Sequence, residues 1–555
     1  MRATVCPDSI ATRSCQSLSL AQYLALSLSL ALPACGGGGM AKRPDMAYAP
    51  EAAMAGDVDQ DGIMDEVDAP DPEPEPEPSR DQYDRVREND FLAVADEPLS
   101  TFSIDVDTAS YSNTRRFLRE GRLPPPGAVR IEELINYFSY DYPQPTAEMP
   151  FAVTAEVGPS PWTPGNQLVH IGLQGRHIAE DQLPPRNLVF LLDVSGSMDA
   201  PDKLGLLKKG FRLLTERLTE KDRVAIAVYA GAAGVVLPPT PGSDAGTILA
   251  ALDQLQAGGS TNGGQGIQLA YALAAQNFRQ DAINRVILAT DGDFNVGTSD
   301  QSSLVRLVEE KRKTGVFLSV LGFGRGNLND SMMEKLADHG NGNYAYIDSQ
   351  AEARKVLVQE AGSTLVTIAK DVKIQVEFNP AEVGKYRLIG YENRMLKNRD
   401  FNDDTKDAGE IGAGHTVTAI YEIVPAGAKG AAEVDALKYQ AERKPTNAAG
   451  SGELMTVKLR YKQPTSETSD LISLGIRGGA RALDATSNNF RFSAAVAGFG
   501  MLLRKSQHAG NLDYQRVKEL AAGAIGRDQN GWRKELVGLI DRAMALTGPV
   551  NNIAN

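Results

Sequence analysis

Three oxygen-bearing side chains follow the apolar run of residues 188–192 at alternate positions. They are Asp193, Ser195 and Ser197. A carboxylate and two hydroxyls in one tight loop can converge on a hard cation such as Mg²⁺, which takes oxygen ligands in octahedral geometry and keeps several waters. The apolar run indicates a buried strand, so the three side chains should stand at its carboxyl end.

Two distant segments carry side chains that can complete the same site. Thr261 lies in the glycine-rich loop 258–264, directly before a helical pattern, and Asp291 follows the apolar run 285–290. We therefore predict one Mg²⁺ or Mn²⁺ site that the three hydroxyl groups bind directly. The two carboxylates bind the ion either directly or through water, and the sequence leaves that choice open.

Helix capping is the competing interpretation of the first loop, because Asp and Ser are common at helix N-termini. The surrounding pattern favours the metal. From residue 187 to about 365, apolar strands alternate with helical segments, which is typical of a doubly wound α/β domain. Ligands of such sheets bind at the carboxyl ends of strands, where Asp193 and Asp291 both stand. The strands are expected at residues 188–192, 223–229, 284–290, 316–322 and 343–347.

The order DxSxS, then Thr, then TDG resembles the metal-ion-dependent adhesion site of von Willebrand factor A domains. The resemblance implies a ligand-binding module and not a catalyst. It extends to the bacterial YfbK-type lipoproteins over roughly residues 86–548. The segments that carry this wider resemblance are 100–111 (STFSIDVDTASY), 123–126 (LPPP), 129–138 (VRIEELINYF) and 489–492 (NFRF).

Segments that alternate apolar and polar residues flank the A domain on both sides. Residues 151–174 alternate before it and several runs alternate after residue 366, which is a strand signature. Too few strands precede the A domain to bury a sheet face alone, so we expect one sandwich interrupted by it. The predicted fold class is α/β: a doubly wound A domain flanked by, and inserted into, a β-rich sandwich, with C-terminal helices.

The expected divisions of the chain follow from these patterns. They are a signal peptide at 1–34, a tether at 35–85, an N-terminal family domain with helices and strands at 86–185, the A domain at 186–365, a β-rich domain at 366–485 and a helical region at 486–555.

The chain begins like a secreted lipoprotein. Residues 18–32 form an apolar run that is shorter than the roughly 20 residues of a membrane-spanning helix, and it follows two arginines. Leu32-Pro-Ala-Cys35 resembles a bacterial lipobox, which implies cleavage before Cys35 and acylation of its thiol. An ordinary signal peptide with an incidental cysteine is the alternative. Gly36 in place of Asp favours the outer membrane if the cell is Gram-negative.

The tether is acidic and contains a possible Ca²⁺ loop. Its run Asp71-Pro-Glu-Pro-Glu-Pro-Glu-Pro78 favours extended polyproline II. Residues 57–68 have oxygen side chains at positions 1, 3, 5, 9 and 12 and glycine at position 6 of a Ca²⁺ loop. They resemble one thrombospondin type 3 or EF-hand-like repeat. Weak Ca²⁺ binding is one interpretation and an acidic disordered stretch is the other. The predicted ligands are Asp57, Asp59, Asp61, Asp65 and Asp68.

Charge and composition narrow the class of partner. The net charge is -14, but residues 51–77 contain 11 acidic side chains and no Lys or Arg, so the folded remainder is almost balanced. A nearly neutral body argues against nucleic acid as a partner. With 555 residues, of which 42% are hydrophobic, the chain is expected to fold into two to four domains.

Enzyme signatures are incomplete in this sequence. Asp105-Val-Asp107-Thr108 resembles a phosphatase DxDx[TV] signature, but Ala109 takes the last position. The loop 258–264 lacks the lysine of a P-loop, and the spacing of the five histidines ties none of them to Ser195. We therefore expect no catalysis and identify no small-molecule substrate.

The resemblance and the site together indicate two classes of function. The first is a metal-dependent, adhesion-like lipoprotein of the cell envelope, anchored in the membrane by lipid, whose cation binds an acidic group of a protein partner. The alternative is a structural or assembly factor of an envelope complex in which the metal is structural. Removal of the metal by a chelator distinguishes them, because it abolishes binding in the first case and unfolds the protein in the second.

Overall fold

The computed structural model describes residues 80–104, 107–146, 148–292, 301–360, 366–428, 445–479 and 481–548. The predicted lipidation site Cys35 and the Ca²⁺ loop at 57–68 lie outside these ranges. Both therefore stay predictions.

A six-stranded sheet forms the centre of the A domain, in the order β10-β9-β8-β5-β6-β7. All neighbours are parallel except the edge strand β7, which pairs antiparallel with β6. The strands are β5 (Arg186–Asp193), β6 (Arg223–Tyr229), β7 (Ala233–Pro241), β8 (Ile283–Thr290), β9 (Phe317–Phe323) and β10 (Tyr344–Ile347). Their continuous apolar runs fit a sheet that is covered on both faces.

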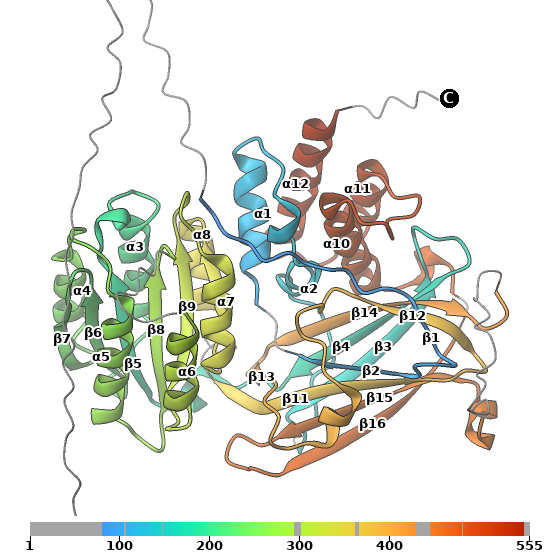
Figure 1. Ribbon diagram of the computed structural model, residues 1–555, viewed down its shortest axis with the longest axis horizontal. Helices are drawn as coiled ribbons and strands as arrows, with labels where there is room; N and C mark the ends of the chain where they lie inside the picture. The colour runs from blue at the N-terminus through green and yellow to red at the C-terminus, as the bar shows by residue number, and fades with distance from the viewer. Residues whose placement is uncertain are drawn as a thin grey trace, which may run out of the picture. The chain divides into compact units, whose positions relative to one another are not determined.

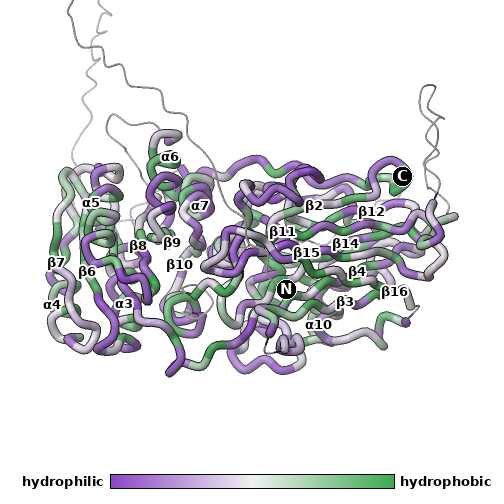
Figure 2. Tube along the Cα trace, turned by 90° about the horizontal axis from the view of Figure 1, so that it is seen from below, coloured by the Kyte–Doolittle hydropathy of each residue, from purple (hydrophilic) through white to green (hydrophobic). Residues whose placement is uncertain are grey.

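Helices cover both faces of this sheet (Figure 1). One face is covered by α3 (Leu204–Thr215), α4 (Ala245–Asp253), α8 (Gln350–Arg354) and the π-helical turn η4 (Lys355–Gln359). The other face is covered by α5 (Gly263–Gln276), α6 (Gln301–Arg312) and α7 (Asp330–His339). Hydrophobic and hydrophilic residues alternate along α6 and α7 (Figure 2), as expected of helices with one buried face.

Two antiparallel sheets form the sandwich. The first has the order β1-β12-β14-β4-β3 and consists of β1 (Leu92–Ala93), β12 (Val383–Ile389), β14 (Thr416–Pro425), β4 (Gln167–Gly175) and β3 (Phe151–Pro159). The second has the order β13-β11-β15-β16, with β2 paired to β11, and consists of β2 (Leu99–Ser103), β13 (Gly409–Gly412), β11 (Thr367–Phe378), β15 (Glu453–Lys462) and β16 (Ser469–Arg477). Strand β4 precedes the A domain and pairs with β14, which follows it. The A domain is therefore an insertion in the sandwich.

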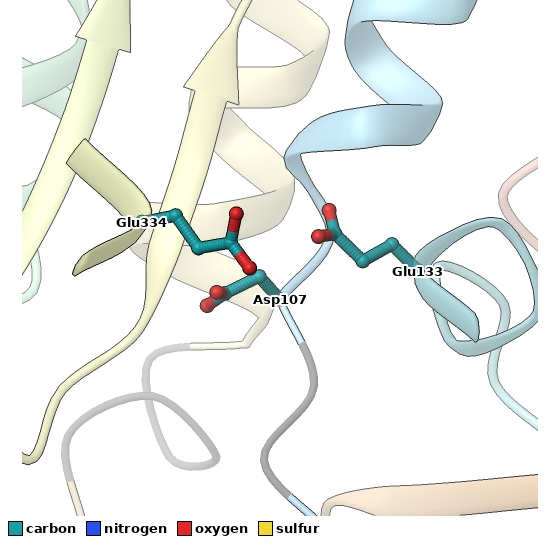
Figure 3. Close-up of side chains that lie close together, drawn as sticks. All are labelled: Asp107, Glu133 and Glu334. Carbon is teal, nitrogen blue, oxygen red and sulfur yellow. The ribbon is translucent and has the colours of Figure 1, made fainter. Parts of the chain in front are cut away.

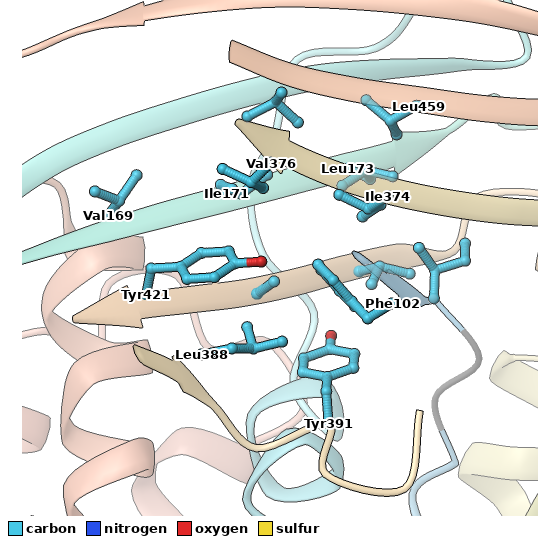
Figure 4. Packing of buried hydrophobic residues seen from close by; sticks show 14 of the residues in the cluster. Phe102, Val169, Ile171, Leu173, Ile374, Val376, Leu388, Tyr391, Tyr421 and Leu459 are labelled. Atoms are coloured by element: carbon cyan, nitrogen blue, oxygen red, sulfur yellow. The ribbon is translucent and has the colours of Figure 1, made fainter. Parts of the chain in front are cut away.

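The sandwich core lies between these two sheets. Ile171 and Leu173 of β4 share one buried cluster with Ile374 and Val376 of β11 (Figure 4). Side chains alternate between the two faces of a strand, so every second residue of these strands enters the core.

Five helices form a layer on the first sheet. They are α1 (Ala109–Arg119), α2 (Ile131–Asn136), α10 (Asn488–Arg504), α11 (Tyr514–Ala522) and α12 (Trp532–Thr547). Their apolar faces share a cluster with Leu168, Ile389 and Ile420 of the sheet. None of the helices in the described ranges has the length and apolar character needed to cross a membrane. Short 3₁₀ turns complete the connections: η1 (Pro126–Ala128), η2 (Glu180–Gln182), η3 (Gly196–Met198), η5 (Asn398–Asn402), η6 (Asn447–Ser451) and η7 (Leu483–Ala485).

The predicted fold class is confirmed, including the doubly wound A domain and the C-terminal helices. Four strands are additional to those expected from the sequence, namely the short strands β1 and β13 and the longer strands β7 and β16. Strand β7 contains Pro238, Pro239 and Pro241, which argue against a strand in general but are tolerated at a sheet edge. Strand β16 is also an edge strand, and its apolar side chains are mostly not fully buried, so its pattern is weak.

Candidate metal site at the strand ends

The first predicted loop leaves β5 at its carboxyl end. Asp193 is the last residue of the strand, and Ser195 and Ser197 lie in and beside the short turn η3. Helix α3 begins only at Leu204, with Lys203 at its N-cap. The two serines therefore do not cap α3, and the capping interpretation does not account for them.

The two serine hydroxyls are spaced as neighbouring ligands of one small cation. The distance between Ser195 Oγ and Ser197 Oγ is 3.1 Å. Ligands at 2.0–2.1 Å in an octahedron leave about 3 Å between adjacent oxygens. The spacing of this pair therefore fits the Mg²⁺ ion that the sequence predicts at this site.

Asp193 is fixed by three donors and is fully buried. Its Oδ1 accepts from the backbone nitrogen of Ser195 at 2.9 Å, and its Oδ2 accepts from Tyr229 Oη at 3.1 Å and Thr290 Oγ1 at 3.0 Å. Burial raises the pKa of Asp193 to about 6. A bound divalent cation supplies the positive charge that favours the ionised form of such a group.

Asp291 follows β8 and brings a second buried carboxylate to the same end of the sheet. Burial alone would raise its pKa, but Lys203 and hydrogen bonds from Asn327 and Ser197 hold the pKa of Asp291 below its ordinary value. The hydrogen bond with Ser197 joins this carboxylate to the serine loop. Gly292 comes next with φ +90°, and a Cβ there would lie 2.5 Å from Asn329 N, so only glycine lets the two loops approach this closely.

Thr261 lies in a loop that is tied to the serine loop by its backbone. Gly258 N donates to Val194 O at 2.8 Å, and Gly196 N donates to Gly259 O at 3.0 Å. Thr261 is half-buried and precedes Asn262, the N-cap of α5. The structure thus brings the loops of all five predicted residues to one edge of the sheet.

Two residues at this site were not predicted as site residues from the sequence. Lys203 and Asn327 both contact Asp291. The available signal was a single lysine that follows Asp199 and Asp202 directly before a helix. A lone lysine is more often solvated, so the pattern did not indicate a buried ion pair.

A second acidic cluster lies between the A domain and the rest of the folded chain (Figure 3). Oxygens of Asp107, Glu133 and Glu334 lie within 4.8 Å of one another, and all three residues are buried. Arginines already occupy this cluster: Arg130 pairs with Glu133, and Arg394 pairs with Asp107 and Glu334. We interpret it as an ionic joint between segments and not as a metal site. Asp107, from the incomplete phosphatase signature, belongs to this joint.

A cavity of about 720 Å³ lies at the opposite edge of the A-domain sheet. Arg186 and Tyr344, the first residues of β5 and β10, line it together with His415 and Thr416 of the sandwich. The five predicted metal-site residues are not among the described residues that line it. The cavity is therefore separate from the candidate site.

Comparisons with known proteins cover most of the chain. The family described as von Willebrand factor type A domain matches residues 187–360, and the family described as Uncharacterized protein YfbK, C-terminal matches residues 363–546. A von Willebrand factor family also matches residues 77–170. A von Willebrand factor A domain implies a protein-interaction or adhesion-like role.

Two curated relatives and one solved structure are similar to this chain. The chain is 44% identical to the uncharacterized protein YfbK of Escherichia coli (strain K12) over 473 residues, which are 84% of this chain and 81% of that protein. It is 28% identical to human inter-alpha-trypsin inhibitor heavy chain H3 over 233 residues, which are 39% of this chain and 25% of that protein. The solved structure of a von Willebrand factor type A protein from Catenulispora acidiphila superimposes with a TM-score of 0.40 and 17% identity, covering 73% of this chain and 91% of that one. The match to YfbK along most of both proteins confirms the resemblance in the sequence, and the chain belongs to the YfbK family of von Willebrand factor A domain proteins.

Proposed function

We propose that this protein binds a partner protein through a divalent cation held at the carboxyl end of the A-domain sheet. Ser195, Ser197 and Thr261 would hold the ion directly, and Asp193 and Asp291 would hold it directly or through water. The bound cation supplies an open coordination position for a carboxylate of the partner. The protein is not an enzyme in this proposal.

The observation that carries the proposal is the 3.1 Å spacing of Ser195 Oγ and Ser197 Oγ beside two fully buried carboxylates. The three hydroxyls are neutral, and Lys203 pairs with one of the two carboxylates, so a divalent ion at this site would leave a net positive charge. An Asp or Glu of the partner then adds a charge-assisted contact that a neutral side chain cannot supply.

The partner would meet three loops around the ion, and loops on a rigid scaffold commonly set specificity. Two of them are the described loops 198–203 and 324–329. The third, at 294–299, lies outside the described residues. We further propose that acylated Cys35 holds the protein in the cell envelope, at the outer membrane if the cell is Gram-negative, and that residues 57–68 bind Ca²⁺ weakly.

The alternative proposal is a structural or assembly factor that needs the metal for its fold. The apolar clusters on the two faces of the A-domain sheet consist of buried aliphatic and aromatic side chains, with the predicted ligands outside them. Such a core does not depend on an ion at the sheet edge. This observation favours the binding role.

The decisive experiment is capture of partners by residues 75–555, the compact unit that includes Asp81, with and without Mg²⁺. We expect a partner that is retained in Mg²⁺, lost in chelator and lost for Ser195→Ala combined with Ser197→Ala. The matched control is Ser302→Ala, a hydroxyl removed from the exposed surface of α6. Circular dichroism in chelator completes the test, because loss of the fold together with loss of binding would support the structural alternative.

A further inference from the structure

The candidate metal site already contains a positive charge of its own. Lys203 is buried, and its Nζ donates to Asp291 Oδ2 at 3.0 Å and to Asn327 Oδ1 at 2.8 Å. The Asp291 carboxylate thus contacts both the ammonium group of Lys203 and the hydroxyl of Ser197, which is one of the predicted metal ligands.

The path of the lysine side chain depends on one glycine. Gly324 has φ +71°, and a Cβ there would lie 2.2 Å from Lys203 Cγ. Tyr346 Oη donates to Gly324 O at 2.7 Å and fixes the backbone at this point. The aliphatic part of Lys203 therefore lies against a fixed stretch of backbone, and the ammonium group is directed to Asp291.

The charge of Lys203 changes the balance of the whole site. Asp193 and Asp291 together carry two negative charges, which a divalent ion alone would neutralise. With the lysine included, the loaded site keeps one net positive charge. The lysine also repels the metal, because like charges at close range disfavour each other in a partly desolvated site.

We propose that Lys203 is a built-in second cation of this site that weakens metal binding and strengthens the binding of a carboxylate to the loaded metal. The inference rests on the proposed function. It adds that Lys203 sets the net charge of the metal site. Lys203 acts through Asp291 and is a positioning residue in this proposal.

Two substitutions separate the charge of Lys203 from its packing. Lys203→Met keeps an unbranched apolar side chain and removes the charge, whereas Lys203→Arg keeps the charge. The matched control is Lys209→Met, which removes a charge from an exposed position on the same helix α3.

The first measurement is calorimetric titration with Mg²⁺ alone of residues 75–555, which form one compact unit and include Asp81. We expect Lys203→Met to bind Mg²⁺ about tenfold more tightly or better, because a unit charge next to a divalent ion matters on that scale even in a polar medium. Lys209→Met should stay close to the unmodified protein, and Lys203→Arg, which keeps the charge, should bind Mg²⁺ more weakly than Lys203→Met. A purely structural role predicts weaker binding for Lys203→Met, so unchanged or weaker binding overturns the proposal.

The second measurement uses acetate as the carboxylate probe. Paramagnetic relaxation of its methyl protons by protein-bound Mn²⁺ reports binding of acetate at the metal. We expect the relaxation enhancement, at full Mn²⁺ occupancy, to fall in Lys203→Met and to persist in Lys209→Met. Equal enhancement in both proteins overturns the anion-binding half of the proposal.

Lys203→Met leaves the buried Asp291 carboxylate without its cation and could fail to fold for that reason. A further pair of variants tests the proposal without this problem. Lys203→Met combined with Asp291→Asn contains neither charge, and it should bind Mg²⁺ more tightly than Asp291→Asn alone. The reverse order overturns the proposal. Failure of the unmodified protein to bind Mg²⁺ or Mn²⁺ overturns the proposed function itself, whereas binding that is indifferent to Lys203 overturns only this inference.

Discussion

Arg130 donates from Nη1 to Oδ2 of Asp330 at 2.6 Å, and this contact joins the segment before the A domain to helix α7 inside it. The Asp330 side chain is fully buried, and it also accepts from Tyr344 Oη at 2.9 Å. Arg130 pairs with Glu133 on its own helix turn as well. One guanidinium group thus holds carboxylates of two segments that are 200 residues apart in the sequence.

We predict that Arg130→Met destabilises the protein by about 3–5 kcal/mol, because it leaves buried carboxylates without their cation. Urea unfolding measures the change. The control is Arg212→Met. The side chain of Arg212 is 44% exposed and that of its partner Asp253 is 57% exposed. An exposed pair of this kind contributes about 1 kcal/mol or less. Equal losses for the two variants would contradict an ionic joint at Arg130.

Mg²⁺ should stabilise the unmodified protein and have no effect on Asp193→Ala. A ligand at about 100 times its Kd adds about 2.7 kcal/mol to the free energy of unfolding. Asp193→Ala removes the carboxylate at the centre of the site and should abolish this gain. The control Asp199→Ala removes an exposed carboxylate from the same loop and should keep it. The measurement is the midpoint of thermal unfolding with and without Mg²⁺. If Mg²⁺ shifts the midpoint of Asp193→Ala, Asp193 is not needed for the metal site.

The strand ends were predictable because the α/β alternation is a strong pattern. Strand β6 has the bounds expected from the sequence, and β5 and β8 end where the predicted carboxylates begin. Parallel strands must end at a common edge, so the sequence alone brings Asp193 and Asp291 together. The insertion of the A domain also followed from strand counting, and the pairing of β4 with β14 agrees with it.

The contacts around the site were less predictable because they depend on loops that are distant in sequence. The contact between Lys203 and Asn327 spans 124 positions, and no local pattern indicates which loop a lysine will meet. The same holds for Tyr229 Oη, which donates to Asp193 from the neighbouring strand β6. Its place at the end of an apolar strand predicts burial but not a hydrogen-bond partner.

The buried ring of His170 should by itself lower the free energy of unfolding as pH falls from 7 to 5. The ring is buried between Tyr142 Oη at 2.6 Å and Ser493 Oγ at 2.8 Å, and burial lowers the pKa of His170 from 6.5 to about 3. In this pH range the unfolded chain takes up a proton that the folded chain does not. His170 alone therefore lowers the free energy of unfolding by about 2 kcal/mol as pH falls from 7 to 5.

His170→Gln keeps hydrogen-bonding groups at this position and removes the titration. We measure the free energy of unfolding in urea at pH 7 and at pH 5. From pH 7 to pH 5, the unmodified protein should lose about 2 kcal/mol relative to His170→Gln. The exposed His177→Gln is the control and should follow the unmodified protein. Burial raises the pKa of Glu132 and Glu133, which acts in the opposite direction, but these groups are present in all three proteins and cancel in the comparison. The same pH dependence in His170→Gln would contradict the prediction.

Cys35→Ser should leave the protein unprocessed or release it from the membrane, because only a thiol can form the thioether of a lipoprotein. The prediction rests on the sequence Leu32-Pro-Ala-Cys35 after an apolar run. A single acyl chain anchors a protein only marginally, so more than one chain is expected on the mature N-terminus. Mass spectrometry of that terminus measures the modification. An unmodified Cys35, or cleavage at another position, would show that the prediction is wrong.

Asp81 should control the order of the loop that carries Asn327. Its Oδ1 accepts from Gly326 N at 3.0 Å and Leu328 N at 3.1 Å, on both sides of Asn327, and its Oδ2 accepts from Arg116 at 2.9 Å. The Asp81 side chain is only 3% exposed. Asp81→Ala removes the acceptor of two backbone amides, of which that of the buried Leu328 cannot readily turn to water. A buried group that loses its partner costs about 1–3 kcal/mol.

Hydrogen exchange resolves this effect at single amides. We expect the amides of Gly326 and Leu328 to exchange faster in Asp81→Ala, while amides in the centre of β8 keep their protection because their ladder bonds do not involve Asp81. Asp84→Ala is the matched control: Asp84 is close in sequence, but it pairs with Lys335 with 65% of its side chain exposed. That variant should leave both loop amides as protected as in the unmodified protein. If Asp81→Ala and Asp84→Ala exchange alike at Gly326 and Leu328, the loop beside the metal site is held by other contacts, and Asp81 has no part in positioning Asn327.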